Sequence, residues 1–281
     1  MNKLVNQILG NEYNFEKCYT LITGACGGLG RAFVSECAKM KENLILIGTS
    51  EKKLESLMSE FSSKFNGIFV RTFVCDLSKP DDIKNLTQKL ADENLVVNKL
   101  INNAGIIMEG DFEKFSDDEI QKTIMVNCSG TVDLTKKLIK ARNKSLRFEV
   151  LTVSSVAAYY PIPHMALYAA TKSFLLSLMT ALADEYKNQN IVFTTVCPGA
   201  MKTNDAMKES IKSMGLGGKL SCVSTEKVAR KSLRALRRKK RILVPGFFNK
   251  LLVLFSKLFS KKILSKSSGK IYKKSQEKRK F

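Results

Sequence analysis

The sequence is short of metal ligands, paired cysteines and hydrolase motifs, and each shortage excludes a class of function. His164 is the only histidine, and no cysteine lies at ligand spacing from it, which argues against a metal centre. The seven cysteines are odd in number and include no Cys-x-x-Cys pair, so we expect reduced, buried thiols. A serine hydrolase is disfavoured because no Gly-x-Ser-x-Gly segment occurs.

The chain also begins without the features of an exported protein. Its first residues lack the long apolar core and small-residue cleavage site of a secretory signal, and reduced thiols are typical of the cytoplasm. A length of 281 residues with 44% hydrophobic content is enough for one large domain. We expect an N-terminal extension over 1–17, a catalytic domain over 18–246 and a C-terminal segment over 247–281.

Acidic residues are scarce only in the last fifth of the chain. Residues 1–226 hold 27 Lys/Arg and 25 Asp/Glu, whereas residues 227–281 hold 20 Lys/Arg and one acid, Glu277. The net charge of +21 therefore belongs almost wholly to the C-terminal part, and we expect its partner to be anionic.

Short apolar runs alternate with amphipathic segments along most of the chain. This alternation predicts a doubly wound, mostly parallel sheet of the Rossmann type, with seven strands and helices on both faces. Ligands of such sheets bind beyond the carboxyl ends of the strands. We expect strands at 18–23, 44–48, 68–75, 99–102, 148–153, 191–196 and 242–244, and helices at about 29–41, 51–65, 80–93, 116–143, 166–188 and 225–238.

Two motifs point to hydride and proton transfer. Tyr168 and Lys172 are four residues apart, so on a helix they share one face, where an ammonium group lowers the pKa of a neighbouring phenol. A phenol tuned in this way can pass a proton to a carbonyl oxygen. The glycine turn at 23–30, between a strand and a helix, lets the backbone approach a dinucleotide pyrophosphate.

Together these motifs resemble the short-chain dehydrogenase/reductase family over roughly residues 18 to 245. The turn fits the family pattern Thr-Gly-x-x-x-Gly-x-Gly, and Asn-Asn-Ala-Gly stands at 102–105. The layout, with a basic and apolar C-terminal segment, is similar to the long-chain 3-oxoacyl reductases and hydroxysteroid dehydrogenases.

The resemblance implies a role for each motif residue. Tyr168 is the acid/base, Lys172 tunes it and holds the nicotinamide ribose, and Ser155 stabilises the substrate oxyanion. Asn127 holds a local helix distortion and a proton-relay water. The cofactor contacts it implies are Thr23, Gly24, Gly28, Leu29, Gly30, Thr49, Ser50, Asp76, Leu77, Asn103, Ala104, Gly105, Tyr168, Lys172, Pro198, Gly199 and Thr203.

The end of the second strand bears on the choice of cofactor. An acidic residue there would bind a ribose 2′-hydroxyl and repel a 2′-phosphate, and none is present at the strand end. Thr49 and Ser50 offer hydroxyls, while Lys52, Lys53 and Arg31 add charge, so NADP(H) is favoured. No arginine stands at position 49, which leaves NAD(H) open.

Residues 200–224 interrupt the alternation with three methionines and a flexible glycine-rich stretch at 215–218. In the family this stretch is the mobile substrate loop, and methionines adapt to irregular apolar ligands, so it favours a lipophilic substrate. The alternatives are a variable surface insertion and ordinary helix packing. His164 lies between Ser155 and Tyr168, either solvated or against substrate.

From Phe247 to Leu264, apolar residues recur at a spacing of three to four with lysines between them, which predicts a basic amphipathic helix. Such a helix can lie in an anionic membrane surface, cover the enzyme's own core or form an oligomer interface. No motif that reads a nucleic-acid groove accompanies the charge.

We therefore expect an NADP(H)-dependent oxidoreductase of a lipophilic carbonyl/alcohol pair, resembling a 3-oxoacyl or steroid enzyme. It would be cytoplasmic, peripheral at a membrane and homo-oligomeric. A 3-oxoacyl-carrier-protein reductase and a non-catalytic nucleotide-binding regulator are the alternatives.

Overall fold

A seven-stranded sheet forms the centre of the molecule in the computed structural model, which describes residues 18–203, 205–213 and 215–277. The predicted extension at 1–17 lies outside these residues. Every strand pairing is parallel, and the strand order is β3-β2-β1-β4-β5-β6-β7, which confirms the Rossmann-type prediction. The strands are β1 (Cys18–Thr23), β2 (Asn43–Gly48), β3 (Val70–Val74), β4 (Val96–Asn102), β5 (Phe148–Val153), β6 (Ile191–Val196) and β7 (Ile242–Leu243).

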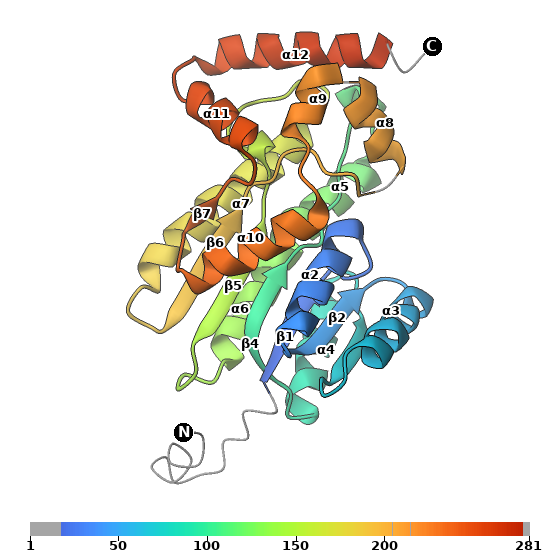
Figure 1. Ribbon diagram of the computed structural model, residues 1–281, viewed down its shortest axis with the longest axis vertical. Helices are drawn as coiled ribbons and strands as arrows, with labels where there is room; N and C mark the ends of the chain where they lie inside the picture. The colour runs from blue at the N-terminus through green and yellow to red at the C-terminus, as the bar shows by residue number, and fades with distance from the viewer. Residues whose placement is uncertain (1–17, 204, 214, 278–281) are drawn as a thin grey trace.

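The helices form a layer on each face of this sheet and a group above it (Figure 1). They are α2 (Gly28–Lys39), α3 (Glu51–Lys64), α4 (Pro80–Asp92), α5 (Asp117–Ile124), α6 (Thr131–Ala141), α7 (Ala166–Glu185), α8 (Asp205–Ser213), α9 (Gly215–Ser221), α10 (Thr225–Arg237), α11 (Phe247–Ser256) and α12 (Lys261–Glu277). A π-helix (Met125–Gly130) joins α5 to α6, and 3₁₀ turns occupy Phe112–Lys114 and Val156–Ala158.

Alternation along the strands divides the core between the two faces. Ile22 and Leu44 pack with α2, α3 and α10, whereas Leu21 and Ile45 pack with α4, α6 and α7. Neighbouring side chains of a strand point to opposite faces, so a strand covered on both sides must be apolar throughout. This explains the continuous apolar runs in the sequence.

The largest departures from the sequence-based expectations lie toward the C-terminus. The predicted loop at 200–224 contains α8 and α9, and the predicted flexible glycines at 215–218 belong to α9. The single helix predicted from Phe247 to Leu264 is two helices, α11 and α12, that meet at residues 257–260. The predicted helix at 116–143 is divided by the π-helix.

The helices α8, α9, α11 and α12 lie together beyond the carboxyl ends of the strands, at the top of Figure 1. The C-terminal helices are fixed to the rest of this group by polar contacts. Asn249 of α11 donates to the Ser221 carbonyl (3.0 Å), and the Ser213 and Ser275 hydroxyls are 2.6 Å apart. Residues 247–277 therefore cover the edge of the sheet where ligands of this fold bind.

Candidate active site

A cavity of about 1190 Å³ lies between the carboxyl edge of the sheet and the C-terminal helices. Its lower part is lined by the glycine turn and by residues that follow β2, β4, β5 and β6. Its upper part is lined mainly by apolar side chains of α11, α12 and the preceding loops. The cavity therefore joins a polar, backbone-rich site to an apolar chamber.

The glycine turn needs glycine because the backbone approaches itself closely. Gly24 has a positive φ of 63°, and a Cβ there would lie 2.9 Å from the Ala104 Cα. A Cβ on Gly30 would lie 2.1 Å from the Gly24 carbonyl oxygen. The first turn of α2 presents its backbone N–H groups toward the cavity, which is the arrangement that suits a pyrophosphate; Leu29 and Gly30 line the cavity, whereas the predicted contact Gly28 is not among the lining residues.

The Asn-Asn-Ala-Gly segment is fastened to this turn. The Thr23 hydroxyl accepts from the backbone N–H groups of Asn103 and Ala104, both at 3.0 Å. The Asn103 amide donates to the carbonyls of Thr23 (3.0 Å) and Gly24 (3.1 Å). These contacts hold two segments that are about eighty residues apart in the sequence as one wall of the cavity.

The adenosine end of the predicted cofactor site is formed by Thr49, Ser50, Asp76 and Leu77, all of which line the cavity. One Asp76 carboxylate oxygen accepts from the Ser78 N–H (2.9 Å) and hydroxyl (2.7 Å). Burial works to raise the Asp76 pKa, but these hydrogen bonds and nearby lysines lower it overall, so the carboxylate is charged near neutral pH.

Of the three cations predicted near the adenosine ribose, Lys53 lines the cavity. Arg31 instead forms an ion pair with Glu60 on the surface (2.5 Å). Lys52 is exposed on the same turn of α3, and the cavity lining does not include it. Of these three cations, Lys53 is therefore the one that lies at the cavity, a distinction that could not be made from the sequence.

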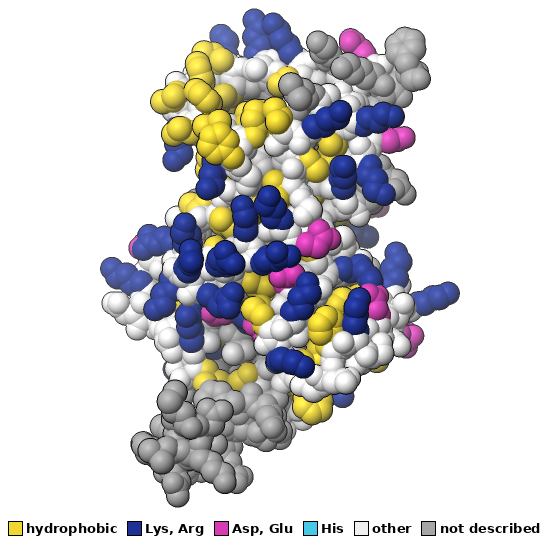
Figure 2. Space-filling view, viewed as in Figure 1, with side chains coloured by type: hydrophobic (Ala, Val, Ile, Leu, Met, Phe, Trp, Pro, Cys, Tyr) yellow, Lys and Arg dark blue, Asp and Glu magenta, His cyan; other side chains and the backbone are white. Residues whose placement is uncertain are grey.

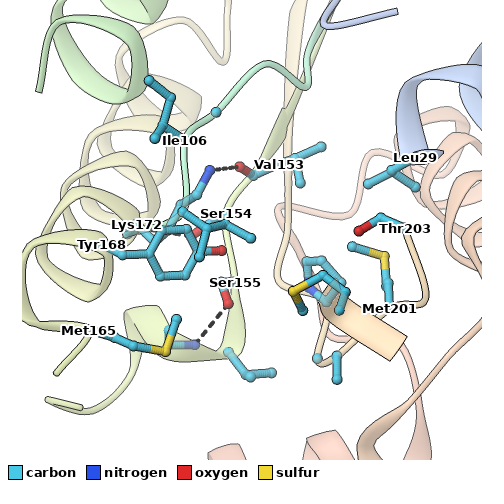
Figure 3. Close-up of a pocket in the computed structure, with 18 of the residues that line it drawn as sticks. Leu29, Ile106, Val153, Ser154, Ser155, Met165, Tyr168, Lys172, Met201 and Thr203 are labelled. Atoms are coloured by element: carbon cyan, nitrogen blue, oxygen red, sulfur yellow. Dashed lines mark hydrogen bonds between the residues drawn. The ribbon is translucent and has the colours of Figure 1, made fainter. Parts of the chain in front are cut away.

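Tyr168, Lys172 and Ser155 converge on the middle of the cavity. Tyr168 and Lys172 lie on the first turns of α7, and the Lys172 Nζ is 5.8 Å from the centre of the Tyr168 ring. Ser155 follows β5 and lines the cavity, whereas the Ser154 hydroxyl is buried and donates to the Lys172 carbonyl (2.7 Å). Figure 3 shows Tyr168, Lys172 and Ser155 on one wall, opposite Leu29 and Thr203.

Asn127 is fully buried in the π-helix and holds the segment after β4. Its Oδ1 accepts from the Ile106 N–H (2.7 Å), and its Nδ2 donates to the Ile106 carbonyl (2.9 Å) and the Thr171 hydroxyl (3.1 Å). A Cβ on Gly105 would lie 3.1 Å from the Lys172 Nζ and 3.3 Å from the Asn127 Oδ1. Asn127 therefore positions the backbone beside Lys172.

Burial shifts the pKa values of the central pair in opposite directions. Burial raises the pKa of the Tyr168 phenol, and its hydrogen bond with Ser155 opposes that rise. Burial lowers the pKa of Lys172 to about 8. The prediction that Lys172 lowers the Tyr168 pKa is wrong for the protein without cofactor. Loss of water around both groups is the dominant effect, and it raises the Tyr168 pKa.

The nicotinamide end is closed by Pro198, Gly199 and Thr203, which all line the cavity. A Cβ on Gly28 would lie 2.9 Å from the Thr203 carbonyl oxygen. A Cβ on Gly199 would meet the Asn249 side chain at 2.5 Å. Asn249 thus packs α11 directly against the Pro-Gly turn, a contact that sequence reasoning missed.

The apolar chamber contains residues that no motif identified. Met201 and Met207 from the predicted loop line it, while Met214 lies outside the described residues. From α12, the lining includes Leu264, Ser268, Ile271 and Ser275. Their spacing of four, three and four residues places them on one helix face, and this pattern was present in the sequence beyond the predicted helix end.

His164 supports α12 and is not among the residues that line the cavity. Its ring stacks on Tyr272 with 4.4 Å between ring centres, and its Nδ1 is 2.9 Å from the Asp111 carboxylate. Nearby, the Ser268 hydroxyl donates to the Pro161 carbonyl (3.1 Å). The segment between Ser155 and Tyr168 is thus fastened to α12.

Within the described residues there is no group of three or more His, Cys, Asp or Glu side chains able to hold a metal ion, and the seven cysteines are free. In the part of the chain that the structure describes, one helix, α7, is long and apolar enough to cross a membrane by length and composition. Because α7 carries Tyr168 and Lys172 and packs on the sheet, we interpret it as the core helix of this fold.

The sequence matches the short chain dehydrogenase family over residues 19–214. The very-long-chain 3-oxoacyl-CoA reductase of Neurospora crassa is 33% identical over 187 residues, which cover 64% of this chain and 55% of the relative. The human 17-beta-hydroxysteroid dehydrogenase type 3 is 29% identical over 229 residues, 75% of this chain and 73% of the relative. The chain thus spans a little over half the length of that reductase.

Solved structures share the fold. A short-chain dehydrogenase from Sphingobium yanoikuyae, in complex with NADPH, has a TM-score of 0.72 and 24% sequence identity, covering 85% of this chain and 94% of that one. The glycine turn, the Asn-Asn-Ala-Gly wall and the first turn of α2 fit a dinucleotide on their own geometry.

Proposed function

Because the chain belongs to the short-chain dehydrogenase family, we propose that it transfers hydride between NADP(H) and the carbonyl/alcohol group of a lipophilic molecule. One observation carries this proposal. Tyr168, Ser155 and Lys172 lie where the dinucleotide part of the cavity meets the apolar chamber. A reacting carbon placed there has a hydride donor on one side and a proton donor on the other.

When bound, the cofactor supplies or accepts the hydride. Tyr168 then donates a proton to the carbonyl oxygen during reduction, or accepts one during oxidation, while the Ser155 hydroxyl hydrogen-bonds the same oxygen. Lys172, with a pKa of about 8, is mostly protonated at neutral pH and stabilises the phenolate left by proton transfer. Asn127 keeps the Gly105–Ile106 backbone beside Lys172, and its proposed relay role stays a prediction.

NADP(H) is the proposed cofactor because the end of β2 carries hydroxyls and a cation instead of an acid. Thr49, Ser50 and Lys53 all line the cavity at this point. A 2′-phosphate would be attracted by Lys53, whereas the acidic residue that binds the free 2′-hydroxyl of NAD is missing from the strand end. NAD(H) remains the alternative.

The substrate is proposed to be 3-oxoacyl- or steroid-like. Phe248, Leu252 and Phe255 of α11 and Met201 and Met207 line the chamber beyond Tyr168, and such a surface stabilises an extended apolar group. The named relatives act, by their names, on 3-oxoacyl-CoA and on 17-beta-hydroxysteroids.

A carrier-protein-linked 3-oxoacyl group is a second candidate substrate. Lys262, Lys266, Lys270 and Lys273 follow at intervals of four, four and three residues, so they form one basic face of α12. Acidic carrier proteins are attracted by such a face. The non-catalytic alternative is a nucleotide-binding regulator, which would bind the cofactor without turning over a substrate.

We further propose that the protein is peripheral at an anionic membrane surface and forms a homo-oligomer. The basic face of α12 supports membrane association, since each lysine near anionic lipid contributes on the order of 1 kcal/mol. The apolar outer side of α7, with Phe174 exposed, supports the homo-oligomer. Light scattering with and without a Phe174→Glu substitution tests the oligomer.

The test of the reaction is a Tyr168→Phe variant assayed with NADPH against 3-oxoacyl-CoA, carrier-linked acyl, steroid and sugar carbonyls. We expect turnover to fall by about 10² to 10⁴ while cofactor binding persists, since only the proton donor is removed. Tyr186→Phe, at the far end of α7, is the matched control and should retain full turnover.

Three outcomes would each overturn part of the proposal. Full turnover by Tyr168→Phe refutes the assigned acid/base. Turnover of sugars alone refutes the lipophilic substrate. Binding of NADPH without turnover of any carbonyl supports the regulator.

A further inference from the structure

α11 presents three different faces, and only one is needed to hold it in place. Asn249, Val253 and Ser256 form the buried face, where Asn249 donates to the carbonyls of Ser221 (3.0 Å) and Pro245 (2.8 Å). Phe248 and Leu252 belong to the second face, which lines the cavity. The third face points to solvent.

This third face is a continuous apolar stripe. Phe247, Leu251, Leu254 and Leu258 follow at intervals of four, three and four residues, so they share one side of α11 and its following turn. Phe247, Leu254 and Leu258 are 77%, 57% and 70% exposed, respectively. Figure 2 shows hydrophobic side chains gathered over α11, with Lys and Arg side chains above them along α12. An exposed apolar patch of this kind marks an interaction surface.

The stripe and the cavity meet at two phenylalanines. Phe255 and Phe259 line the cavity, yet they are also 52% and 50% exposed. They stand at the seam between α11 and α12, around residues 257–260. Because both rings are half exposed and also line the chamber, they mark an apolar route from outside toward Tyr168.

α11 and α12 are held by contacts with different neighbours, so the seam is the place where these two helices can separate. One edge of α12 is fastened to the 161–164 segment by the Ser268–Pro161 hydrogen bond and by the stacking of His164 on Tyr272. Its C-terminal end is fastened to α8 through Ser275 and Ser213. α11 is held instead by α9, through Asn249. The two helices are thus anchored to different partners.

Charge decides between a lipid surface and a second copy as the occupant of the stripe. Lys250 and Lys257 flank the stripe, and Lys261 and Lys262 follow it. Two copies packed stripe to stripe would bring these lysines together and repel, whereas anionic headgroups around buried acyl chains would pair with them.

We propose that the α11 stripe inserts into an anionic bilayer and that the seam at Phe255 and Phe259 opens the cavity to the lipid, so that the substrate enters from the membrane. This inference rests on the proposed function only for the chemical identity of the substrate that enters the cavity. A membrane-dissolved carbonyl would then reach Tyr168 through an apolar passage without crossing water.

The first experiment locates the stripe, using the absence of tryptophan from the sequence. Leu258→Trp places one indole on the stripe, and Phe69→Trp, at a residue that is 62% exposed beside β3, is the matched control. With phosphatidylserine-containing vesicles at low salt, we expect a blue shift and quenching by brominated lipid for the first variant only. No shift, equal shifts in both variants, or a concentration-dependent shift without vesicles overturns the docking surface.

The second experiment tests the entrance. Wild type and a Leu254→Ser/Leu258→Ser variant are assayed with NADPH on a short water-soluble ketone and on a long-chain ketone held in the same vesicles. We expect the variant to lose about tenfold in rate on the vesicle-held ketone, because insertion is weakened, and to keep the rate on the soluble ketone within about twofold. Phe69→Ser is the control and should match wild type on both.

Equal rates on the vesicle-held ketone for wild type and the double variant would overturn the entrance, even where the indole shifts. Failure of wild type to reduce either ketone would refute the proposed function for these carbonyls. The fluorescence result is independent of turnover, so the two failures are distinguishable.

Discussion

Lys172 carries a cost in stability that its replacement should reveal. It is buried, and its pKa is lowered from 10.5 to about 8 with burial as the main cause. That difference corresponds to about 3 kcal/mol against the charged form. Its hydrogen bond to the Val153 carbonyl (3.0 Å) returns about 1 kcal/mol. Lys172→Met should therefore raise the free energy of unfolding at pH 7 by about 2 kcal/mol while abolishing turnover.

The sign of the pH dependence follows from proton binding. Below pH 8 the lysine is charged in both folded and unfolded states, so the whole cost of burying the charge is present. Between pH 8 and 10.5 the unfolded state binds more protons, so the stability of wild type rises with pH and the advantage of Lys172→Met shrinks. Denaturant unfolding without cofactor, at pH 7 and at pH near 10, measures both effects.

Lys99→Met is the matched control with the opposite expected sign. Lys99 is also buried, but it forms ion pairs with Glu42 and Glu149. Burial lowers its pKa, and the two carboxylates more than offset this and raise it overall. Its removal leaves the Glu42 carboxylate without an ion pair, whereas Glu149 keeps its pair with Arg147 (2.8 Å), and should destabilise the fold by about 3 kcal/mol. If Lys172→Met is less stable than wild type at pH 7, the assigned cost of the buried charge is refuted.

Two further predictions concern the cofactor site. Gly30→Ala places a Cβ 2.1 Å from the Gly24 carbonyl oxygen, so it should destabilise the fold by about 3 kcal/mol and abolish cofactor binding. Gly217→Ala is the control, because a Cβ there has nothing within 4 Å. Denaturant unfolding should show it to be neutral or slightly stabilising. Lys53→Glu should raise the Kd for NADPH about tenfold and leave that for NADH nearly unchanged, with exposed Lys52→Glu as control; equal losses for both cofactors would argue against a 2′-phosphate contact.

Local regularities in the sequence were enough to predict the sheet and the lower cavity. Strands β5 and β6 begin and end at the predicted residues because continuous apolar runs are required where both faces of a sheet are covered. The glycine turn and the Tyr168–Lys172 pair are local spacings, so their positions on the cavity wall followed from the rule that ligands bind at the carboxyl ends of parallel strands.

The tertiary structure alone decided the upper cavity and the electrostatics of its centre. The face of α12 that carries Leu264, Ser268 and Ile271 was present in the sequence, but its contact with the 161–164 segment joins residues about a hundred positions apart. The pKa directions of Tyr168 and Lys172 depend on how much water the whole fold removes from them, a quantity that residue spacing does not contain. Local periodicity specifies helices and strands, whereas burial and long-range contacts exist only once those elements are packed.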